Sequence, residues 1–262
     1  GNYIHFKGLE IANSAQKPGE VPWSAFRAGF ANNCILENIN YHHNASAMQI
    51  RGNSSNNLIL NSDFHHNQDP YGSNGSGLDA FDGADGFSFN NSTGTNNIIR
   101  GCRSWWNADD GFDFWANEGY VLIENSWAFW NGYVPGSFND AGNGSGFKLG
   151  LTSPRTSELL RTVQNCVAHR NRSFGIAENQ TDCKSNIFNN TISQSGVYGN
   201  WFGVWNTTAV ATLKNNISYL NNSNQYGAQV IFQANSWQNS LSATAADFIS
   251  TDDTQLDDAR QA

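Results

Sequence analysis

The segment VLIENSWAFWN, Val121–Asn131, contains a pattern that recurs along the chain. An aliphatic residue, Ile123, is followed two positions later by Asn125, and Asn131 follows six positions after that. Apolar and polar residues alternate along the segment, which predicts a β-strand rather than a helix. The pattern therefore indicates a short strand flanked by asparagines at two fixed corners.

Seven copies of this pattern follow one another. The aliphatic residues are Leu36, Ile59, Ile99, Ile123, Val163, Ile187 and Leu213. The first corner is Asn38, Asn61, Gly101, Asn125, Asn165, Asn189 and Asn215, and the second is Asn44, Asn67, Asn107, Asn131, Asn171, Ser195 and Asn221. The copies are 23, 40, 24, 40, 24 and 26 residues apart, a period near 24 with about 16 residues inserted twice. Short strands at this period predict an all-β solenoid, a parallel β-helix whose coils stack about 4.8 Å apart.

Stacked coils place the corner asparagines one above another. Each amide can then donate to the next, as in cross-β assemblies, so we expect structural asparagine ladders rather than sugar-binding residues. In the same stack Cys102 and Cys166 would lie two coils apart, about 9.6 Å, which exceeds the roughly 7 Å limit for a disulfide. Cys34 and Cys183 would lie about six coils apart. We expect four reduced, mostly buried thiols, and the lack of a CxxC pair argues against zinc.

Composition limits the partners. The 262-residue chain carries a net charge of -8, which argues against nucleic acid, because phosphate recognition needs a basic stripe. An acidic polymer stays compatible if a cation bridges it to the protein. No apolar run approaches the roughly 20 residues of a membrane span.

We expect a monomer with one domain, 1–262, in which an irregular tail from about 239 to 262 packs on the helix. Because the first residues already read as strand, we expect a trimmed or mature chain.

A second phrase occurs three times, as DGADGFSFN (82–90), NADDGFDFW (107–115) and GNGSGFKLG (142–150). Each copy has a Gly-Phe pair, one polar residue and a large apolar residue. Because neighbours in a strand point to opposite faces, the apolar residues should point into the helix. The polar residues Ser88, Asp113 and Lys148 should point out to solvent and form one column.

This alignment gathers carboxylates. Asp85 should stack beneath Asp110 with Asp109 beside it, and Asp113 should lie one coil from Lys148. Four carboxylates this close would repel one another, and a hard divalent cation with oxygen ligands, Ca²⁺, resolves the repulsion. The alternative is a set of surface carboxylates on a Gly-rich turn, with Lys148 in a surface salt bridge to Asp113.

A calcium ion beside a basic residue suits β-elimination from a uronate polymer, because the cation can acidify the C5 proton and a neutral lysine can remove it. An alignment of NRSFGIAEN with DDGFDFW places Arg172 in the Asp110 column two coils on, with Ser145 between. Arg172 could bind a substrate carboxylate with both arms of its guanidinium, or it could form an ion pair with Glu178. We weigh these two roles equally.

The two insertions lie between Asn67 and Asn107 and between Asn131 and Asn171. Both are rich in glycine and contain aromatic residues, and both leave the coils that carry the carboxylates. Because long loops in solenoids are usually functional or disordered, we expect them to form the walls of a groove. Most of the nearby tryptophans should serve in packing: Trp105, Trp106, Trp115, Trp127 and Trp130.

The segments DGADGF, NADDGFDFW, IENSWAFWNG and GNGSGFKLG resemble the pectate lyases of polysaccharide lyase family 9, from about Tyr3 to Arg260. The resemblance implies a right-handed parallel β-helix that cleaves an acidic plant cell-wall polysaccharide. Because an enzyme that degrades a polymer must meet it outside the cytoplasm, we expect a protein secreted to the cell exterior or the periplasm. The resemblance also implies that Lys148 is the base and that calcium is held by four residues: Asp85, Asp109, Asp110 and Asp113.

The resemblance leaves the substrate open, because the family also contains rhamnogalacturonan lyases and exo-acting enzymes. Two alternatives come from other classes. A non-catalytic β-helix, such as an adhesin or a polysaccharide-binding module, would need no lysine above the aspartates. A hydrolase on the same fold would use two or three carboxylates as acid and base without calcium.

Overall fold

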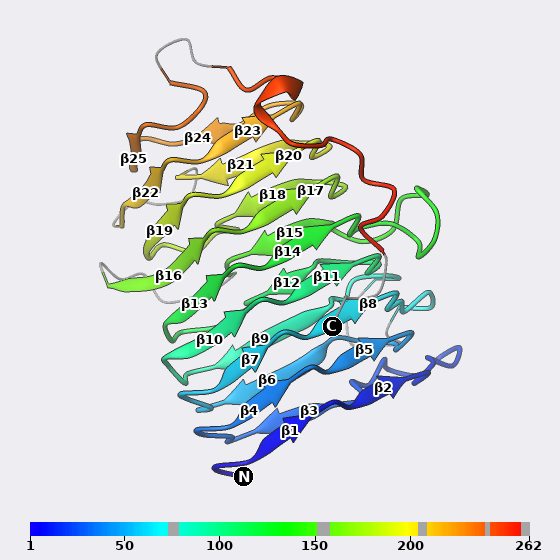
Figure 1. Ribbon diagram of the computed structural model, residues 1–262. Coiled ribbons are helices and arrows are strands. Elements are labelled where there is room, and N and C mark those ends of the chain that lie inside the picture. Colours follow the sequence, from blue (N-terminus) through cyan, green and yellow to red (C-terminus); the bar gives the residue numbers. More distant parts are fainter. Residues whose placement is uncertain (73–78, 151–157, 204–208, 239–241, 258–262) are drawn as a thin grey trace.

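The computed structural model describes residues 1–72, 79–150, 158–203, 209–238 and 242–257. Within these residues the chain winds through three parallel sheets of nine, eight and eight strands, and each coil adds one strand to each sheet (Figure 1). Consecutive strands therefore lie in different sheets, and each strand pairs with the one three positions later. The predicted parallel β-helix is confirmed.

The first sheet contains β1 (His5–Lys7), β4 (Ile35–Glu37), β7 (Leu58–Leu60), β10 (Asn97–Arg100), β13 (Val121–Glu124), β16 (Leu159–Gln164), β19 (Lys184–Phe188), β22 (Ala211–Lys214) and β25 (Val230–Gln233). The second sheet contains β2 (Glu10–Ala12), β5 (Asn40–His42), β8 (Asp63–His65), β11 (Arg103–Trp105), β14 (Trp127–Phe129), β17 (Val167–His169), β20 (Thr191–Ser193) and β23 (Ile217–Tyr219). The third sheet contains β3 (Arg27–Gly29), β6 (Met48–Gly52), β9 (Phe87–Ser92), β12 (Phe112–Asp113), β15 (Ser145–Lys148), β18 (Phe174–Ala177), β21 (Tyr198–Phe202) and β24 (Gln225–Tyr226).

The core is a stack of inward-facing apolar side chains. In each copy of the second phrase, the apolar residues on either side of the single polar residue belong to this core. All six are fully buried: Phe87, Phe89, Phe112, Phe114, Phe147 and Leu149. The rings of Phe112 and Phe147 stack in successive coils with centroids 5.3 Å apart. The predicted inward orientation is confirmed, and this packing fixes the opposite face of the third sheet as its outer face.

The second corner is an asparagine ladder. The side-chain amide of Asn67 donates to Asn107 Oδ1 at 2.7 Å, Asn107 donates to Asn131 at 2.9 Å, and Asn131 donates to Asn171 at 3.0 Å. All four residues are fully buried. The ladder satisfies buried amides that would otherwise destabilise the core, so the predicted structural role is confirmed here.

The first corner has a different basis. All seven of its residues adopt the left-handed conformation, with φ from 47° at Asn61 to 65° at Gly101. Asparagine and glycine tolerate this conformation better than other residues, which explains why glycine replaces asparagine once. In four copies the residue that follows this corner accepts a backbone N–H of the preceding coil; these residues are Ser62, Ser126, Asn190 and Asn216. Asn190, Asn216 and Asn235 form a further ladder there.

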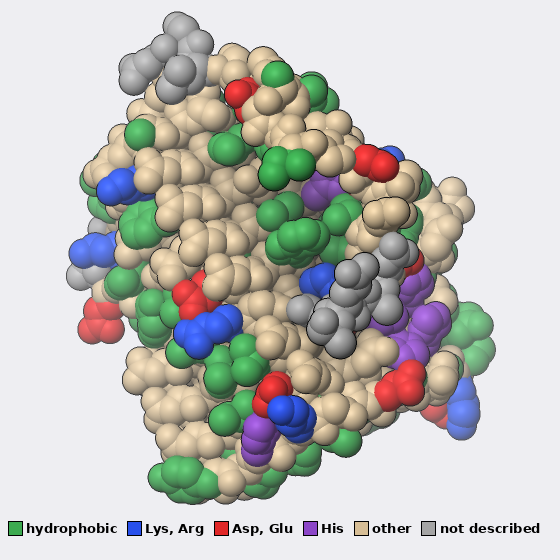
Figure 2. Space-filling model, in the orientation of Figure 1, with side chains coloured by type: hydrophobic (Ala, Val, Ile, Leu, Met, Phe, Trp, Pro, Cys, Tyr) green, Lys and Arg blue, Asp and Glu red, His purple; other side chains and the backbone are tan. Residues whose placement is uncertain are grey.

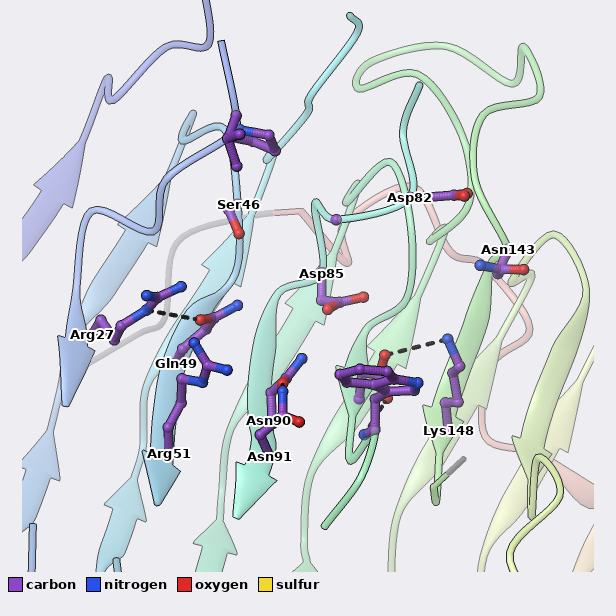
Figure 3. A pocket seen from close by; sticks show the side chains of 15 residues that line it. Arg27, Ser46, Gln49, Arg51, Asp82, Asp85, Asn90, Asn91, Asn143 and Lys148 are labelled. Atoms are coloured by element: carbon purple, nitrogen blue, oxygen red, sulfur yellow. Dashed lines mark hydrogen bonds and ion pairs between the residues drawn. The ribbon is translucent and has the colours of Figure 1, made fainter. Parts of the chain in front are cut away.

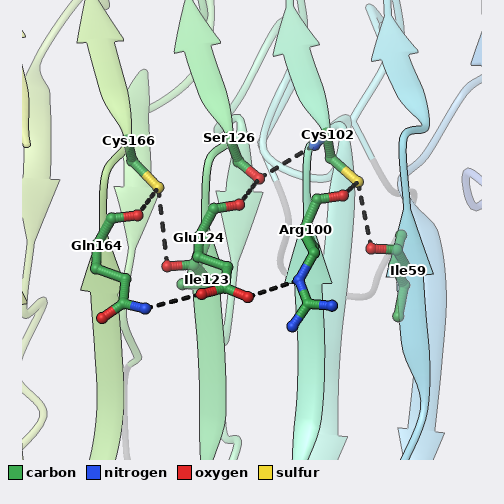
Figure 4. Close-up of polar contacts among 8 residues, drawn as sticks. All are labelled: Ile59, Arg100, Cys102, Ile123, Glu124, Ser126, Gln164 and Cys166. Atoms are coloured by element: carbon green, nitrogen blue, oxygen red, sulfur yellow. Dashed lines mark hydrogen bonds and ion pairs between the residues drawn. The ribbon is translucent and has the colours of Figure 1, made fainter.

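The four cysteines are buried and form no disulfide among the described residues, as predicted. Cys102 and Cys166 lie on either side of Ser126 in successive coils (Figure 4). The Cys102 thiol donates to the carbonyl oxygen of Ile59 at 3.5 Å, and the Cys166 thiol donates to that of Ile123 at 3.8 Å. The thiols therefore join coils by weak hydrogen bonds.

After β25, the chain turns back along the outside of the second sheet, where it forms a short 3₁₀ helix, η1 (Ala245–Asp247). Asp253 accepts hydrogen bonds from His169 at 2.9 Å and from Arg170 at 2.7 Å, and the Phe248 ring packs on Tyr219. In the described part of the chain, no helix is long and apolar enough to span a membrane.

Candidate functional site

A column of glycines sets the register of the site strands. A Cβ atom at Gly111 would lie 2.6 Å from the carbonyl oxygen of Gly146 and 2.8 Å from the ladder amide of Asn131. A Cβ atom at Gly146 would meet Asn171 and the carbonyl oxygen of Gly175 in the same way. The Gly-Phe pair therefore recurs because the backbone passes too close to the ladder and to the next coil for any side chain.

The glycine column also shows that Arg172 does not occupy the strand position predicted for it. Gly175 continues the column, and β15 pairs with β18 so that Ser145 lies opposite Phe174. The Asp110 column therefore continues through Ser145 to Phe174, and the prediction that Arg172 occupies it is wrong. The alignment of NRSFGIAEN with DDGFDFW matched Phe174 with Phe112. The backbones of successive coils approach so closely at this position that a glycine must lie opposite a glycine, so Gly175 is the residue that matches Gly146 and Gly111.

Arg172 instead contacts the second inserted loop. Its Nε atom lies 3.3 Å from Asp140 Oδ1, and its Nη1 donates to the carbonyl oxygen of Gly142 at 2.9 Å. The alternative ion pair between Arg172 and Glu178 is not formed, because Arg172 pairs with Asp140 while Glu178 accepts the backbone N–H of Gly203 at 2.7 Å. Arg172 thus lies where it can hold the loop.

Three of the predicted carboxylates converge. Asp85, Asp110 and Asp113 each offer an oxygen atom within 4.8 Å of the other two, and all three are buried. The backbone N–H of Asp110 donates to Asp85 Oδ1 at 3.2 Å, as expected from their stacking in successive coils. Asp109 is also buried, and its Oδ1 accepts the backbone N–H of Asn143 at 2.6 Å. Asp109 thus lies beside the group and fastens the second inserted loop.

Lys148 lies directly against this group. Its Nζ is 2.8 Å from Asp110 Oδ2 and 3.2 Å from Asp113 Oδ2, and the strand register pairs Asp113 with Lys148. The column of polar residues does lie on the outer face of the sheet, but the prediction that it is exposed to solvent is wrong. Ser88 and Asp113 are buried, and only 12% of the Lys148 side chain is exposed.

Burial and mutual repulsion perturb these groups strongly. Burial raises the pKa of Asp85 and Asp109 well above the usual range, and the neighbouring carboxylates raise it further. Burial also raises the pKa of Asp113, to about 6, although Lys148 opposes the shift. Burial alone would lower the pKa of Lys148, but the surrounding carboxylates outweigh it and hold that pKa well above its usual value.

This group of carboxylates fits a hard cation. It offers several buried oxygen ligands from adjacent coils, and the one described cationic side chain that contacts them is Lys148. Oxygen-only ligand sets suit Ca²⁺, which accepts six to eight oxygen atoms. The residues present are therefore chemically matched to calcium.

The carboxylates open into an elongated cavity of about 560 Å³ on the outer face of the third sheet (Figure 3). Its floor runs across five strands, from Arg27 in β3 to Lys148 in β15. Asp82 from the first insertion and Asn143 from the second line its walls, so the prediction that the insertions border a groove is confirmed. Residues 73–78 of the first insertion lie outside the described residues. A third wall, formed by Val21 and Pro22, was not predicted.

The floor also contains residues that the sequence alone did not reveal. The strand register extends the polar column from Ser88 to Gln49 in β6 and then to Arg27 in β3, and Arg51 lies two residues beyond Gln49. These coils lack the Gly-Phe pair, so the repeated phrase does not reach them. The alternation in Met48–Gly52 was a usable signal, because it places Gln49 and Arg51 on the outer face.

The tryptophans mostly pack on the second sheet. Trp105, Trp106 and Trp130 form a buried cluster with Phe129. Trp115 alone among the five highlighted in the sequence lines the described cavity. The prediction that most of them serve in packing is therefore confirmed.

Comparison with known proteins places these features in context. A family model described as "Pel9A-like, right handed beta helix region" matches residues 1–243. The chain is 34% identical to pectate lyase L of Dickeya chrysanthemi over 256 residues, which is 96% of this chain and 55% of that protein. The crystal structure of pectate lyase Pel9A is similar with a TM-score of 0.79 and 31% identity, covering 98% of this chain and 60% of that one.

A structure titled rhamnogalacturonan lyase is similar with a TM-score of 0.82 and 28% identity, and the match covers all of this chain and 68% of that one. The predicted right-handed β-helix agrees with these matches. The chain thus spans little more than half the length of pectate lyase L.

Proposed function

Because the chain belongs to the Pel9A-like right-handed β-helix family, we propose that it is a calcium-dependent polysaccharide lyase that cleaves a polyuronate such as polygalacturonate. The observation that carries this proposal is the contact of Lys148 with a buried group of carboxylates on the floor of an elongated cavity. The names of the similar proteins point to the same chemistry.

In this proposal Asp85, Asp109, Asp110 and Asp113 hold calcium. When bound, the ion would neutralise the uronate carboxylate and withdraw electron density from it, which makes the C5 proton more acidic. Asp110 and Asp113 also pair with the Lys148 ammonium, and the same oxygen atoms cannot serve both cations fully. Calcium binding to these carboxylates should therefore weaken their ion pairs with the Lys148 ammonium and so lower the pKa of Lys148.

Lys148 acts as the base in its neutral form. It accepts the C5 proton, the C5–H electron pair forms the C4–C5 double bond, and the C4–O4 bond breaks. The departing O4 takes up a proton, so the chain is cut without consuming water. The walls of the cavity limit access of solvent to Lys148, which keeps the charged groups in a medium of low dielectric.

The proposal also covers the setting of the reaction. The substrate would be an acidic plant cell-wall polysaccharide, and its size requires that the enzyme meet it outside the cytoplasm, either secreted from the cell or in the periplasm. We expect the β-helix to act as a monomer, since one chain contributes every residue named in the site.

Rhamnogalacturonan is the second candidate substrate, favoured by the similarity to the rhamnogalacturonan lyase structure. Each polymer should be incubated with the protein, with calcium or with a chelator, while absorbance from the unsaturated product is followed. We expect absorbance to rise with polygalacturonate and calcium only. New reducing ends without absorbance would instead indicate a hydrolase, and binding without cleavage would indicate a polysaccharide-binding module.

A further inference from the structure

We propose that Arg27, Gln49 and Arg51 form a second anion site in the same cavity, which binds a carboxylate of the uronate polymer at a distance from the cleaved bond. This inference rests on the proposed function for the identity of the polymer. It assigns a role to the end of the cavity opposite Lys148, where the repeated sequence phrase does not reach.

The position of these residues follows from the strand register. Arg27, Gln49, Ser88, Asp113 and Lys148 occupy equivalent positions in β3, β6, β9, β12 and β15. At about 4.8 Å for each strand, Gln49 lies roughly 14 Å from Lys148 along the helix axis and Arg27 roughly 19 Å. Both line the same cavity as Lys148. A single sugar cannot reach both ends, but an oligosaccharide lying across the strands can.

The two arginines lie close together without a carboxylate partner. Arg27 Nε donates to Gln49 Oε1 at 3.2 Å, and the Arg27 guanidinium lies 5.4 Å from the ring centre of Trp23. Burial, assisted by the positive charge of Arg51, lowers the pKa of Arg27. Among the described residues, no acidic side chain lies within 4.0 Å of either guanidinium, in a chain with a net charge of -8. Such a pair would be stabilised by a bound anion.

The other described arginines have their guanidinium groups satisfied within the protein. Arg161 is buried and donates to backbone carbonyl oxygens, and the rest pair with carboxylates. Arg100 pairs with Glu124 at 2.6 Å, Arg103 pairs with Asp63 at 2.8 Å, and Arg170 pairs with Asp253 at 2.7 Å. Guanidinium groups bind carboxylates with two parallel hydrogen bonds, and a uronate polymer presents the same group. The chemical class that fits Arg27 and Arg51 is therefore a carboxylate.

The two ends of the cavity differ in the way they would hold that carboxylate. At the Lys148 end the floor is acidic and needs a bridging cation, whereas at the Arg27 end the floor is basic and needs none. Asn90 and Asn91 lie between the two ends and carry no charge (Figure 3). The arginine site should therefore bind a uronate oligomer even when calcium is removed, which separates its test from the test of lyase activity.

The test measures binding of hexagalacturonate to the full chain in a chelator by calorimetry, so that no cleavage occurs. Arg51→Gln should weaken binding roughly tenfold, because one charge-assisted hydrogen-bonding group is lost. Arg51→Lys should give an intermediate loss, since a point charge cannot make two parallel bonds. Arg100→Gln is the matched control, because Arg100 lies on the first sheet, and its binding should equal that of the wild type.

In calcium, Arg51→Gln should raise KM by a similar factor while kcat stays unchanged. Fully methyl-esterified hexagalacturonate should bind the wild type at least as weakly as the acid form binds Arg51→Gln, because the ester offers no carboxylate to either arginine. Equal dissociation constants for Arg51→Gln and Arg100→Gln, with both variants folded by circular dichroism, would overturn the anion site. Weakened binding in a chain that shows no lyase activity would support the anion site and contradict the proposed function.

Discussion

Lys148 contacts two aspartates that are themselves proposed calcium ligands, so its role can be separated from theirs by substitution. Lys148→Ala should lower the elimination rate by about 10²–10⁴-fold, the usual contribution of a general base. Lys148→Arg should fail nearly as badly, because guanidinium stays protonated. The rate of absorbance increase on polygalacturonate measures the effect.

Calcium binding and folding provide the control for these variants. Both variants should still bind calcium and should keep the wild-type circular dichroism spectrum, because Lys148 projects from the outer face of the sheet and contributes nothing to the aromatic core. Substantial lyase activity in purified Lys148→Ala would remove Lys148 as the base.

Asp110 is the most constrained of the carboxylates. Its Oδ1 accepts the backbone N–H of Ser145 at 2.5 Å, and its Oδ2 pairs with Lys148. Asp110→Asn keeps the shape of the side chain but removes one negative charge from the group. We expect calcium affinity to fall at least tenfold, which corresponds to about 1.4 kcal/mol. Calorimetric titration with calcium measures the change, and Asp252→Asn in the exposed tail is the control. An unchanged dissociation constant in Asp110→Asn would contradict the proposed site.

At the scale of single elements, two histidine pairs stack on the outer face of the second sheet. His42 stacks on His65 with ring centres 4.9 Å apart, His43 stacks on His66 at 5.1 Å, and Trp105 covers His65 at 4.2 Å. Figure 2 shows histidine side chains gathered at one edge of the face in view. These rings continue the aromatic stack from one coil to the next.

This stack makes stability depend on pH. Burial, with repulsion from His66 and His42, lowers the pKa of His65 to about 3, whereas the unfolded chain keeps a value of about 6.5. Between these values the unfolded state binds more protons. The contribution of neutral His65 is therefore complete above pH 6.5 and is lost as the pH falls toward 3, with a slope of at most about 1.4 kcal/mol per pH unit.

Urea unfolding of the wild type and His65→Gln, from pH 7 to pH 4, tests this linkage. The free energy of unfolding of the wild type should fall more steeply than that of the variant. The raised pKa of Asp113 acts in the opposite direction, but it is common to both proteins and cancels in the comparison. Parallel curves would show that His65 titrates normally in the folded state.

The second inserted loop is held by Arg172 through Asp140 and Gly142. Asp140 is 70% exposed, so the ion pair should contribute only about 0.5 kcal/mol. Arg172→Ala should increase proteolytic cleavage within 132–144 and raise KM because the wall is loosened. Limited proteolysis and kinetics on the same variant test this. A higher KM without faster cleavage of the loop would instead support direct contact between Arg172 and the substrate.

At the scale of the whole molecule, each coil is stabilised by its two neighbours, so protection should be greatest in the centre of the stack. β13 alternates buried and half-buried residues, whereas β1 and β25 have no fully buried residue. Amide hydrogen exchange should therefore be slowest in β10, β13 and β16 and fastest in β1 and β25. Uniform protection along the chain would indicate a single cooperative unit instead.

Much of this architecture could be predicted because each coil repeats the same short pattern of aliphatic residues, corner asparagines and Gly-Phe pairs. The repeated Gly-Phe pair placed Asp113 opposite Lys148 and Asp85 beneath Asp110, because the members of each couple lie at the same offset from their own Gly-Phe pair. The position of Arg172 could not be obtained in this way. In the segment NRSFGIAEN, matching Phe174 to the repeated phenylalanine gives one alignment and matching Gly175 to the repeated glycine gives another. The close contact of Gly175 with the next coil, which is visible only in the structure, selects the second alignment.

The environment of the outer face could not be predicted either. Period-two alternation separates inward from outward positions, but it does not say where the inserted loops lie. Loop residues such as Asp82 and Asn143 form walls of the cavity beside the column, and Asp113 is buried although it points away from the core. The arginines at the far end were missed because their coils keep the alternation but lack the Gly-Phe pair.

The constant spacing of the coils makes the third sheet a ruler. The separation between Arg51 and Lys148 is a whole number of strand steps, maintained by backbone hydrogen bonds that do not depend on side-chain identity. Inserting one further coil of about 24 residues between β6 and β9, which are neighbours in the sheet, would lengthen that separation by one step and leave both groups intact. The length of oligomer that spans the cavity could thus be reset by units of sequence, without redesigning a single contact.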